Sequence, residues 1–427
     1  MTPEVKERIE QIRHGVVPEG YATIGQWIIP KDWPIANLAQ VSDKSGYGMN
    51  VSAKEYDGKN KYIRITDIDD MSHKYIHSNA MSPDGNLCDE YKVNSDDLLF
   101  ARTGASTGKT YLYSCEDGTL YFAGFLIRFH IKKDCSSHYV FYHTQTAQYN
   151  KWINIMSVRS GQPGINAQEY GKYRFPLPSY LEQNRIAAVL VVQDEIIDLK
   201  EKLLAEKQRQ KKYLMQQLLT GKKRLPGFDC EWKTVRLGQI SKRIRERNHI
   251  GSTNVMTISA QFGLINQEEF FNKAIASDDK SNYFLLHRND FAYNKSYSTG
   301  YPYGAIKRLT RYDSGIVSPL YICFCIKRMD VSVDFMAHYF EAGLMNREIQ
   351  AFAQEGARNH GLLNIAVEDF FNSKITLPPF EEQQAIAAIL TTADKEIDLL
   401  RQDLEQEKQK KKALMQLLLT GIVRVPL

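Results

Sequence analysis

Apolar residues recur in alternating steps of four and three along two long stretches of the chain. In the second stretch the recurring positions are Ile386, Leu390, Ala393, Ile397, Leu400, Leu404, Glu407, Lys411, Leu414 and Leu418. In the first stretch they are Ile186, Leu190, Gln193, Ile197, Lys200, Leu204, Lys207, Lys211, Leu214 and Leu218, with polar residues in the middle. This spacing is typical of the seam of a coiled coil. The pattern therefore predicts two long helices that pair with each other.

The two stretches belong to an internal repeat. The segment that begins LPSYLEQNRIAAVL at Leu177 aligns without a gap with LPPFEEQQAIAAIL at Leu377, and the match extends to Pro226 and Pro426. Of these 50 positions, 24 are identical. Such self-similarity indicates a tandem duplication of about half the chain.

Signals for helix ends frame each copy. Ser179 and Glu182 predict a capping box at the start of the first helix, and a pair of prolines precedes the second. Gly221 and Gly421 favour left-handed caps at the two ends. The predicted helices are about forty residues and roughly 60 Å long.

Short β-branched and aromatic runs separated by Gly, Asn and Asp fill the regions before the two helices. They predict mixed α/β domains. The expected organisation is an α/β protein with a first domain at 1–176, which includes an N-terminal helical segment, a first long helix at 177–226, a second domain at 227–376 and a second long helix at 377–427. Antiparallel pairing of the helices would place one domain at each end, related by a pseudo-twofold axis.

Composition narrows the class of protein. The 427 residues are 43% hydrophobic and 25% charged, and the longest apolar run, 186–192, is too short to span a bilayer. The charged N-terminal segment lacks the apolar core of a secretory signal, so we expect a cytoplasmic protein. The net charge of +5 permits binding to nucleic acid without demanding it. His73 and His77 have Lys74 where a zinc protease motif places glutamate, and no metal site is expected.

The stretch GASTGKT at 104–110 resembles a phosphate-binding loop. Such a loop has four residues between its first glycine and its Gly-Lys pair, so that successive backbone N–H groups wrap the phosphates. Here only three residues separate Gly104 from Gly108. The related stretch in the second half keeps Ser-Thr-Gly but has Tyr301 in place of Lys109. We therefore expect no hydrolysis of nucleotides.

A second stretch, LPPF at 377–380, resembles the NPPF loop of amino-methyltransferases. Its leucine cannot accept a hydrogen bond from the exocyclic amine of a flipped base. The sequence also shows no glycine-rich motif for S-adenosylmethionine. Both observations predict a non-catalytic chain.

Polar loops that contain glycine supply the candidate contacts to DNA. DLLFARTGASTG at 97–108 is related to DFAYNKSYSTG at 290–300, and SVRSGQPGIN and EGARNHGLLN precede the two helices. Their side chains are types that donate to phosphates and base edges. The candidate DNA-binding residues are Arg102, Thr103, Ser106, Thr107, Lys109, Arg159, Gln162, Lys295, Ser296, Tyr297, Ser298, Thr299, Arg358, Asn359 and His360. The alternative for these loops is that they are only exposed turns or helix caps. The basic tract at 207–228 is a separate candidate, which faces DNA, a partner protein or only solvent.

With these features the chain resembles the specificity (S, HsdS-type) subunit of Type I restriction-modification systems. The resemblance rests on the repeated LPxYxEQ or LPxFxEQ start, the IAA(V/I)L run, the LLTG end and the strand-like YIRITDID at 62–69, and it covers nearly all of the chain. It implies two target-recognition domains separated by two long antiparallel helices. Each domain would read one half of a bipartite, asymmetric site in double-stranded DNA.

The resemblance also implies partners. The family's subunit is not itself an enzyme and holds two methyltransferase subunits, while larger assemblies add ATP-dependent restriction subunits. S-adenosylmethionine, ATP and magnesium would belong to those partners. Near-identical helices suit two copies of one partner, whereas divergent domains suit two different half-sites. The alternative is a coiled-coil scaffold that binds no DNA.

One segment departs from the repeat. Residues 1–29 precede the first domain, and IRHGVVPEGY at 12–21 faintly echoes LLTGKKRLPGF at 218–228. We expect this segment to lie beside the C-terminal end of the chain.

Overall fold

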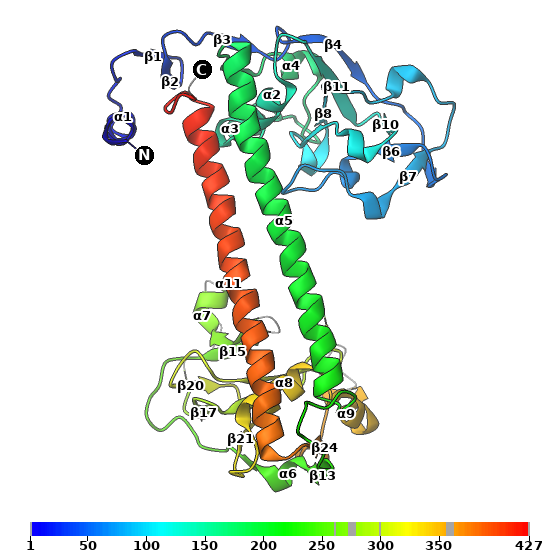
Figure 1. Cartoon of the computed structure of the whole chain (residues 1–427), viewed down its shortest axis with the longest axis vertical. Coiled ribbons are helices and arrows are strands. Elements are labelled where there is room, and N and C mark those ends of the chain that lie inside the picture. The colour runs from blue at the N-terminus through cyan, green and yellow to red at the C-terminus, as the bar shows by residue number, and fades with distance from the viewer. Residues whose placement is uncertain (1, 260–261, 272–278, 299, 356–362, 426–427) are drawn as a thin grey trace. The chain divides into compact units, whose positions relative to one another are not determined.

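The structure is a computed structural model that describes residues 2–259, 262–271, 279–298, 300–355 and 363–425 (Figure 1). The chain divides into two compact units. The first unit comprises Met1–Lys200 and Asp403–Leu427, and the second comprises Glu201–Gln402. Each unit therefore contains part of both long helices, α5 (Tyr180–Leu218) and α11 (Phe380–Leu418).

The first unit adds a set of short helices and strands. Its helices are α1 (Pro3–Arg13), α2 (Ser137–His143), α3 (Ala147–Met156) and α4 (Ala167–Gly171). Its strands are β1 (Tyr21–Ile24), β2 (Trp27–Pro30), β3 (Ile35–Asn37), β4 (Ser42–Tyr47), β5 (Ala53–Glu55), β6 (Lys61–Ile63), β7 (Met81–Pro83), β8 (Asp97–Ala101), β9 (Thr110–Leu112), β10 (Leu120–Phe122), β11 (Leu126–Ile131) and β12 (Arg174–Pro176).

The second unit is built in a similar way. Its helices are α6 (Leu237–Ile240), α7 (Gln267–Phe271), α8 (Val333–Glu341), α9 (Asn346–Phe352) and α10 (Val367–Asn372). Its strands are β13 (Lys233–Arg236), β14 (Ser241–Arg243), β15 (Met256–Ser259), β16 (Gly263–Asn266), β17 (Phe284–His287), β18 (Phe291–Asn294), β19 (Ala305–Arg308), β20 (Ser314–Val317), β21 (Ile322–Ile326), β22 (Gln354–Glu355), β23 (Leu363–Asn364) and β24 (Lys374–Leu377).

A four-stranded antiparallel sheet forms the centre of each unit. The strand order is β4-β11-β8-β9 in the first unit and β14-β21-β18-β19 in the second. Alternate strand residues face the core, where Phe100 packs against Phe129 and Tyr170 in the first unit, and Phe291 packs against Phe324 in the second. The predicted mixed α/β class and the internal repeat are confirmed, and the repeat extends to sheets whose sequences have diverged.

The predicted coiled-coil seam is confirmed, since none of its positions is exposed. In the first unit Gln193 donates to Glu407 at 2.8 Å, and Lys200 pairs with Asp403 at 2.7 Å. In the second unit Lys207 pairs with Glu396 at 2.6 Å. Partner numbers fall on one helix as they rise on the other, so α5 and α11 run antiparallel. Polar positions of the first copy thus meet acidic residues of the second.

A buried glutamate fixes the start of each long helix, and one hydrogen bond of the predicted capping box is present at the first. Ser179 does accept from the Glu182 amide at 3.3 Å. The Glu182 carboxylate, however, accepts from Trp33 Nε1 at 3.3 Å and from both Nε and Nη2 of Arg424. A fully desolvated carboxylate is bound more strongly by a guanidinium than by one backbone N–H. The Glu182 side chain therefore anchors the helix to the unit.

The second unit repeats this arrangement. Glu382 accepts from Trp232 Nε1 at 3.1 Å and from Arg224 at 2.8 Å through two nitrogens. The adjacent glutamines act alike, because Gln183 accepts from the Ser136 amide and Gln383 from the Ser332 amide, each at 2.9 Å. The repeated Glu-Gln dipeptide thus holds each helix against its own globular part.

The N-terminal segment lies beside the C-terminal end, as predicted. Tyr21 donates to the Gly421 carbonyl at 2.6 Å, and Arg8 donates to the Ile422 carbonyl at 2.9 Å. Gly421 has φ +68°, the left-handed cap expected from the sequence, and a Cβ at this position would lie 2.7 Å from Pro30. Glycine is therefore needed both for the turn and for the close approach.

Candidate nucleic-acid interface

Two polar loops of the first unit meet at one edge of its sheet. Strand β8 ends at Ala101, and Arg102 begins the loop to β9. The Arg102 carbonyl accepts from the Ile165 amide at 2.9 Å, and the Gly104 amide donates to the Pro163 carbonyl at 2.9 Å. The loop at 102–109 and the segment at 157–166, proposed separately from the sequence, therefore form one surface. At the same edge β4 ends, and the Arg102 guanidinium lies 4.9 Å from the ring centre of Tyr47.

The backbone of the glycine-rich loop is committed to the fold. Residues 104–106 form a single 3₁₀ turn, and the amides of Gly104, Thr107, Gly108 and Lys109 donate to protein carbonyls. A phosphate cradle would need such amides free for the ligand. The Lys109 ammonium pairs with Asp70 and donates to the Ile68 carbonyl at 3.0 Å. The geometry is that of a tight turn between β8 and β9.

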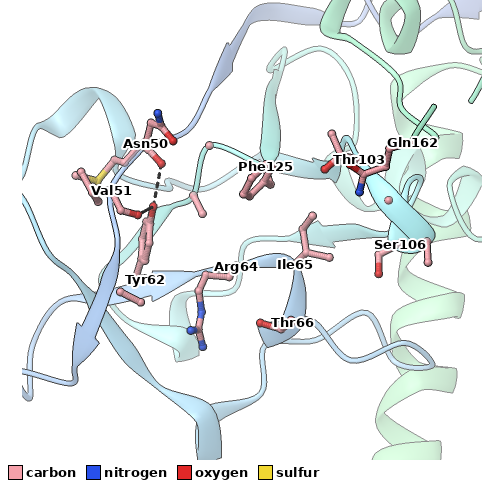
Figure 2. Close-up of a pocket in the computed structure, with 16 residues that line it drawn as sticks. Asn50, Val51, Tyr62, Arg64, Ile65, Thr66, Thr103, Ser106, Phe125 and Gln162 are labelled. Carbon is pink, nitrogen blue, oxygen red and sulfur yellow. Dashed lines mark hydrogen bonds between the residues drawn. The ribbon is translucent and has the colours of Figure 1, made fainter. Parts of the chain in front are cut away.

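A pocket of about 550 Å³ opens beside this loop. Figure 2 shows Tyr62 on one side of it, Thr103 and Gln162 on the other, and Phe125 between them. Ser106 and Arg64 also line the pocket. The polar side chains offer both donors and acceptors, which is the chemistry needed to read the edge of a base.

Arg64 is held in a fixed orientation at this pocket. Its Nε and Nη2 donate to the two oxygens of Asp67, each at 2.7 Å, and Asp67 is completely buried. The hydrogen bonds to Asp67 raise the pKa of Arg64. A guanidinium fixed on one side by a carboxylate presents its remaining N–H groups in a defined direction. Arg64 lies within the YIRITDID stretch and is not among the candidate residues predicted from the loops, although its three-residue spacing to Asp67 is a usable signal.

Other predicted contact residues of the first unit are already engaged within the protein. Arg159 pairs with both oxygens of Glu169 at 2.6 Å and donates to the Met156 carbonyl. The Thr107 hydroxyl donates to the Gly104 carbonyl at 2.8 Å. These side chains, like Lys109, would have to exchange their present partners to contact DNA.

In the second unit Lys295 occupies the position of Arg102. It follows β18 as Arg102 follows β8, and its carbonyl accepts from the Leu363 amide at 3.0 Å. The next residues, Ser296, Tyr297 and Ser298, form the loop to β19, with Tyr297 exposed. Thr299, Arg358, Asn359 and His360 lie outside the described residues.

The residue after the loop glycine anchors the turn in both units. Tyr301, which replaces Lys109, donates to Glu341 at 2.6 Å and accepts from Lys307 at 3.0 Å. Burial raises the pKa of Tyr301, so its hydroxyl remains a donor. The sequence change from lysine to tyrosine thus preserves an anchoring role.

Among the described residues, no helix is long and apolar enough to cross a membrane. No group of three or more His, Cys, Asp or Glu side chains in these parts of the chain is placed to hold a metal ion.

Comparison with known proteins places this architecture among relatives. The family model described as the Type I restriction modification DNA specificity domain matches residues 30–208 and again 230–409. The putative type I restriction enzyme MjaX specificity subunit of Methanocaldococcus jannaschii is 25% identical over 433 residues, which cover 93% of this chain and 95% of that protein. The MjaVIII specificity subunit of the same organism is 23% identical, covering 93% of this chain and 94% of that protein.

Solved structures share the fold. The S subunit of the Type I restriction-modification system from M. genitalium superposes with a TM-score of 0.56 at 12% identity, covering 93% of this chain and 98% of that one. A chain from a study of complex assembly and conformational transition in the type I R-M system has a TM-score of 0.51 at 16% identity, covering 92% and 99%.

Proposed function

Because this chain belongs to the Type I restriction modification DNA specificity domain family, we propose that it is the DNA-recognition subunit of a Type I restriction-modification complex. Each unit reads one half of a bipartite, asymmetric DNA site. The single observation that carries this assignment is the pair of sheets with the same strand order and different side chains at the edge where the loops meet. A common scaffold with different loops suits two units that recognise different DNA half-sites.

The two sheet edges that carry the loops can be compared residue by residue, and their differences suggest different base preferences in the two half-sites. Arg102 and Lys295 are both basic and suit the phosphates that every sequence presents. Arg64 follows directly after β6. Tyr62 of β6 pairs in parallel with Tyr121, and Val255 pairs in parallel with Ile316 at the matching place in the second unit. Arg64 is two residues after Tyr62, so its counterpart is Thr257, two residues after Val255. Arginine suits guanine, whereas threonine has no such preference, so the two units would select different bases.

The long helices offer equivalent surfaces for two copies of one partner. Val189 and Leu199 are exposed on α5 in the first unit, and Ile389 and Leu399 are exposed on α11 in the second. These four residues occupy matching positions of the repeat, at the offset of 200. Exposed apolar residues on helices mark contact surfaces when they recur in a pattern. We assign them to the docking of two methyltransferase subunits.

The chain itself is proposed to be non-catalytic and cytoplasmic. Methylation with S-adenosylmethionine, and cleavage driven by ATP and magnesium where restriction subunits are present, would be carried out by the partners. The committed amides of the 104–109 loop support a recognition role rather than nucleotide hydrolysis. The alternative of a scaffold that binds only proteins has no comparable support.

Expression with its methyltransferase in cells free of DNA methylation, followed by methylome sequencing, tests this function. We expect one motif with two defined halves separated by unspecified bases. Replacement of residues 227–376 by the second domain of a related specificity subunit should change one half of the motif and leave the other intact. A change in both halves, or the absence of a duplex band shift with the partners present, would contradict the assignment.

A further inference from the structure

Both units expose a large apolar side chain at the same position. Phe125 is 60% exposed and Leu320 is 65% exposed. Phe125 lies two residues before Ile127, which pairs with Phe100 on β8, and Leu320 lies two residues before Ile322, which pairs with Tyr293 on β18. A single exposed apolar residue needs no explanation. Two at one position of otherwise divergent domains indicate a retained role.

Each side chain is carried by the same closed turn. The Leu126 amide donates to the Ala123 carbonyl at 2.8 Å, and the Tyr321 amide donates to the Ser318 carbonyl at 3.1 Å. Phe125 and Leu320 are the third residues of these turns. In the first unit Gly124 also donates to the Met49 carbonyl at 2.6 Å. In the second unit proline takes the second position, which suits such turns. The side chains are therefore held out from rigid backbone.

The turns lie at the edge that carries the polar loops. The Phe125 carbonyl accepts from the Arg102 amide at 3.0 Å, and its ring lies in the pocket between Tyr62 and Gln162 (Figure 2). Leu320 precedes β21 at the end where its neighbour β18 runs into Lys295. Phe125 thus lies among side chains assigned above to DNA, and Leu320 lies at the corresponding end of its own sheet.

We propose that Phe125 and Leu320 act as apolar wedges that insert between stacked base pairs, one in each half-site. This inference rests on the proposed function. Neither side chain can donate or accept a hydrogen bond, so neither can read a base edge. Insertion of Phe or Leu at a base step unstacks it and buries the apolar side chain. A rigid turn lowers the entropic cost of presenting that side chain. The wedge serves both half-sites equally, whereas the loops around it select sequence.

The test uses the complex of the full chain with its methyltransferase subunits and duplexes that carry the mapped motif. 2-Aminopurine, whose fluorescence rises on unstacking, replaces one base at a time through both half-sites. The unsubstituted protein should raise fluorescence at one step in each half, distinct from the base that the methyltransferase subunit flips out of the stack. Phe125→Ala should abolish the rise in one half only, Leu320→Ala in the other only, and each should weaken binding about ten-fold, the size of a single stacking contact.

Matched variants separate the wedge from a structural effect. Phe125→Leu and Leu320→Phe exchange the two wedges and should keep the signal. Val16→Ala and Met329→Ala remove exposed apolar side chains elsewhere in the first and second units and should leave it unchanged. Thermal unfolding of each variant should match that of the parent chain.

Three results would overturn the wedge. One is unaltered fluorescence in both alanine variants. Another is a loss of binding on replacing thymine by uracil in the duplex that equals the loss in the alanine variants, with no sign of unstacking. That result would indicate that the side chains contact a thymine methyl group in the groove. The third is release of the methyltransferase by Phe125→Ala with DNA binding otherwise intact, because it would assign these residues to the protein partner. If the unsubstituted complex binds no specific duplex, the proposed function itself has failed.

Discussion

The Glu-Gln dipeptide that begins each repeated helix illustrates what a residue pattern conceals. Glu182 is separated from its partners Trp33 and Arg424 by 149 and 242 positions. A capping box joins residues three apart, so the local pattern favoured it. The long-range partners became visible only when the fold brought tryptophan and arginine to the same carboxylate. The repeat has the glutamate in both copies, but the sequence does not reveal its partners.

The candidate site was predicted unevenly for the same reason. The loop residues were found because arginine, glutamine and threonine beside glycine are typical of polar contact surfaces. Phe125 was not found, since an exposed phenylalanine cannot be distinguished from a core one without the fold. Lys109 and Arg159 were chosen by residue type, and their pairing with Asp70 and Glu169 depends on tertiary structure.

His143 gives the first unit a dependence on pH. Complete burial, between Phe175 and Tyr139, lowers the pKa of His143 to about 3. In the unfolded chain the imidazole has a pKa near 6.5 and binds a proton more readily. The contribution of neutral His143 to the unfolding free energy is therefore fully present above about pH 6.5 and is lost as the pH falls toward 3. Between pH 7 and 5 we expect this residue to cost about 2 kcal/mol of unfolding free energy.

Denaturant unfolding at both pH values measures this effect. His143→Phe keeps an aromatic ring against Phe175 and removes the titrating group, so the difference between pH 7 and 5 should shrink by about 2 kcal/mol. An equal pH dependence in the two proteins would show that His143 is not the group responsible.

At the level of elements, the sequence predicted most where the pattern was longest. Helices α5 and α11 and their seam followed from ten matched positions each, and the glycine caps from Gly221 and Gly421. The short strands could be predicted as a class only. Parallel pairing of β6 with β10, for example, joins residues some sixty positions apart and is set by packing rather than by alternation in either strand.

The anchoring of each helix start predicts a large effect of a single arginine. Arg424→Ala would leave the buried Glu182 carboxylate with only Trp33 as donor, and we expect a loss of about 2 to 4 kcal/mol in unfolding free energy. Arg224→Ala should also destabilise the chain, because it removes the guanidinium that pairs with buried Glu382 in the second unit. Urea denaturation provides the measurement.

Two further variants define the cause. Adding Glu182→Gln to Arg424→Ala should recover part of the loss, since a neutral amide does not need a cation. Arg401→Ala removes an arginine whose exposed pair with Asp398 contributes little, and stability should stay within about 0.5 kcal/mol. A loss at Arg401 as large as that at Arg424 would argue against a specific anchor.

For the molecule as a whole, the centre of the seam distinguishes the two repeat copies. The first copy contributes Lys200 and Lys207, and the second contributes Glu396, Asp403 and Glu407. Hydrogen bonds from Gln193 and Lys200 lower the pKa of Glu407 to about 2, so it stays ionised. Complementary charge at polar seam positions selects partner and register. The seam therefore favours pairing of the first copy with the second over pairing of either with itself.

A fragment of residues 1 to about 224 tests this selection. Its unpaired helix should form an antiparallel dimer, because Ile186 then meets Leu218 and Arg224 can replace Arg424 beside Glu182. The dimer should be weak, since Lys200 of each chain faces Lys207 of the other. Light scattering should show association that strengthens with salt, because salt screens like charges.

Charge exchange provides the control. Lys207→Glu in the fragment recreates the pair that Lys200 makes with Glu407, and the dimer should tighten about ten-fold. In the full chain the same substitution removes the partner of Glu396 and should lower stability. A fragment that stays monomeric at tens of micromolar would refute the helix-pairing model. A Lys207→Glu fragment that dimerises no more tightly than the parent fragment would show that the seam charges do not meet.

The same charges bear on how such genes can recombine. A crossover within the globular regions leaves both long helices in place, and the Glu-Gln anchors at their starts are the same in both copies. A crossover that joins helix segments of different copies can place one lysine-bearing helix centre opposite a second one, and their like charges repel. Inheritance of one lysine-bearing helix together with one acidic helix, with free exchange of the globular regions that precede them, is the pattern of descent that this seam permits.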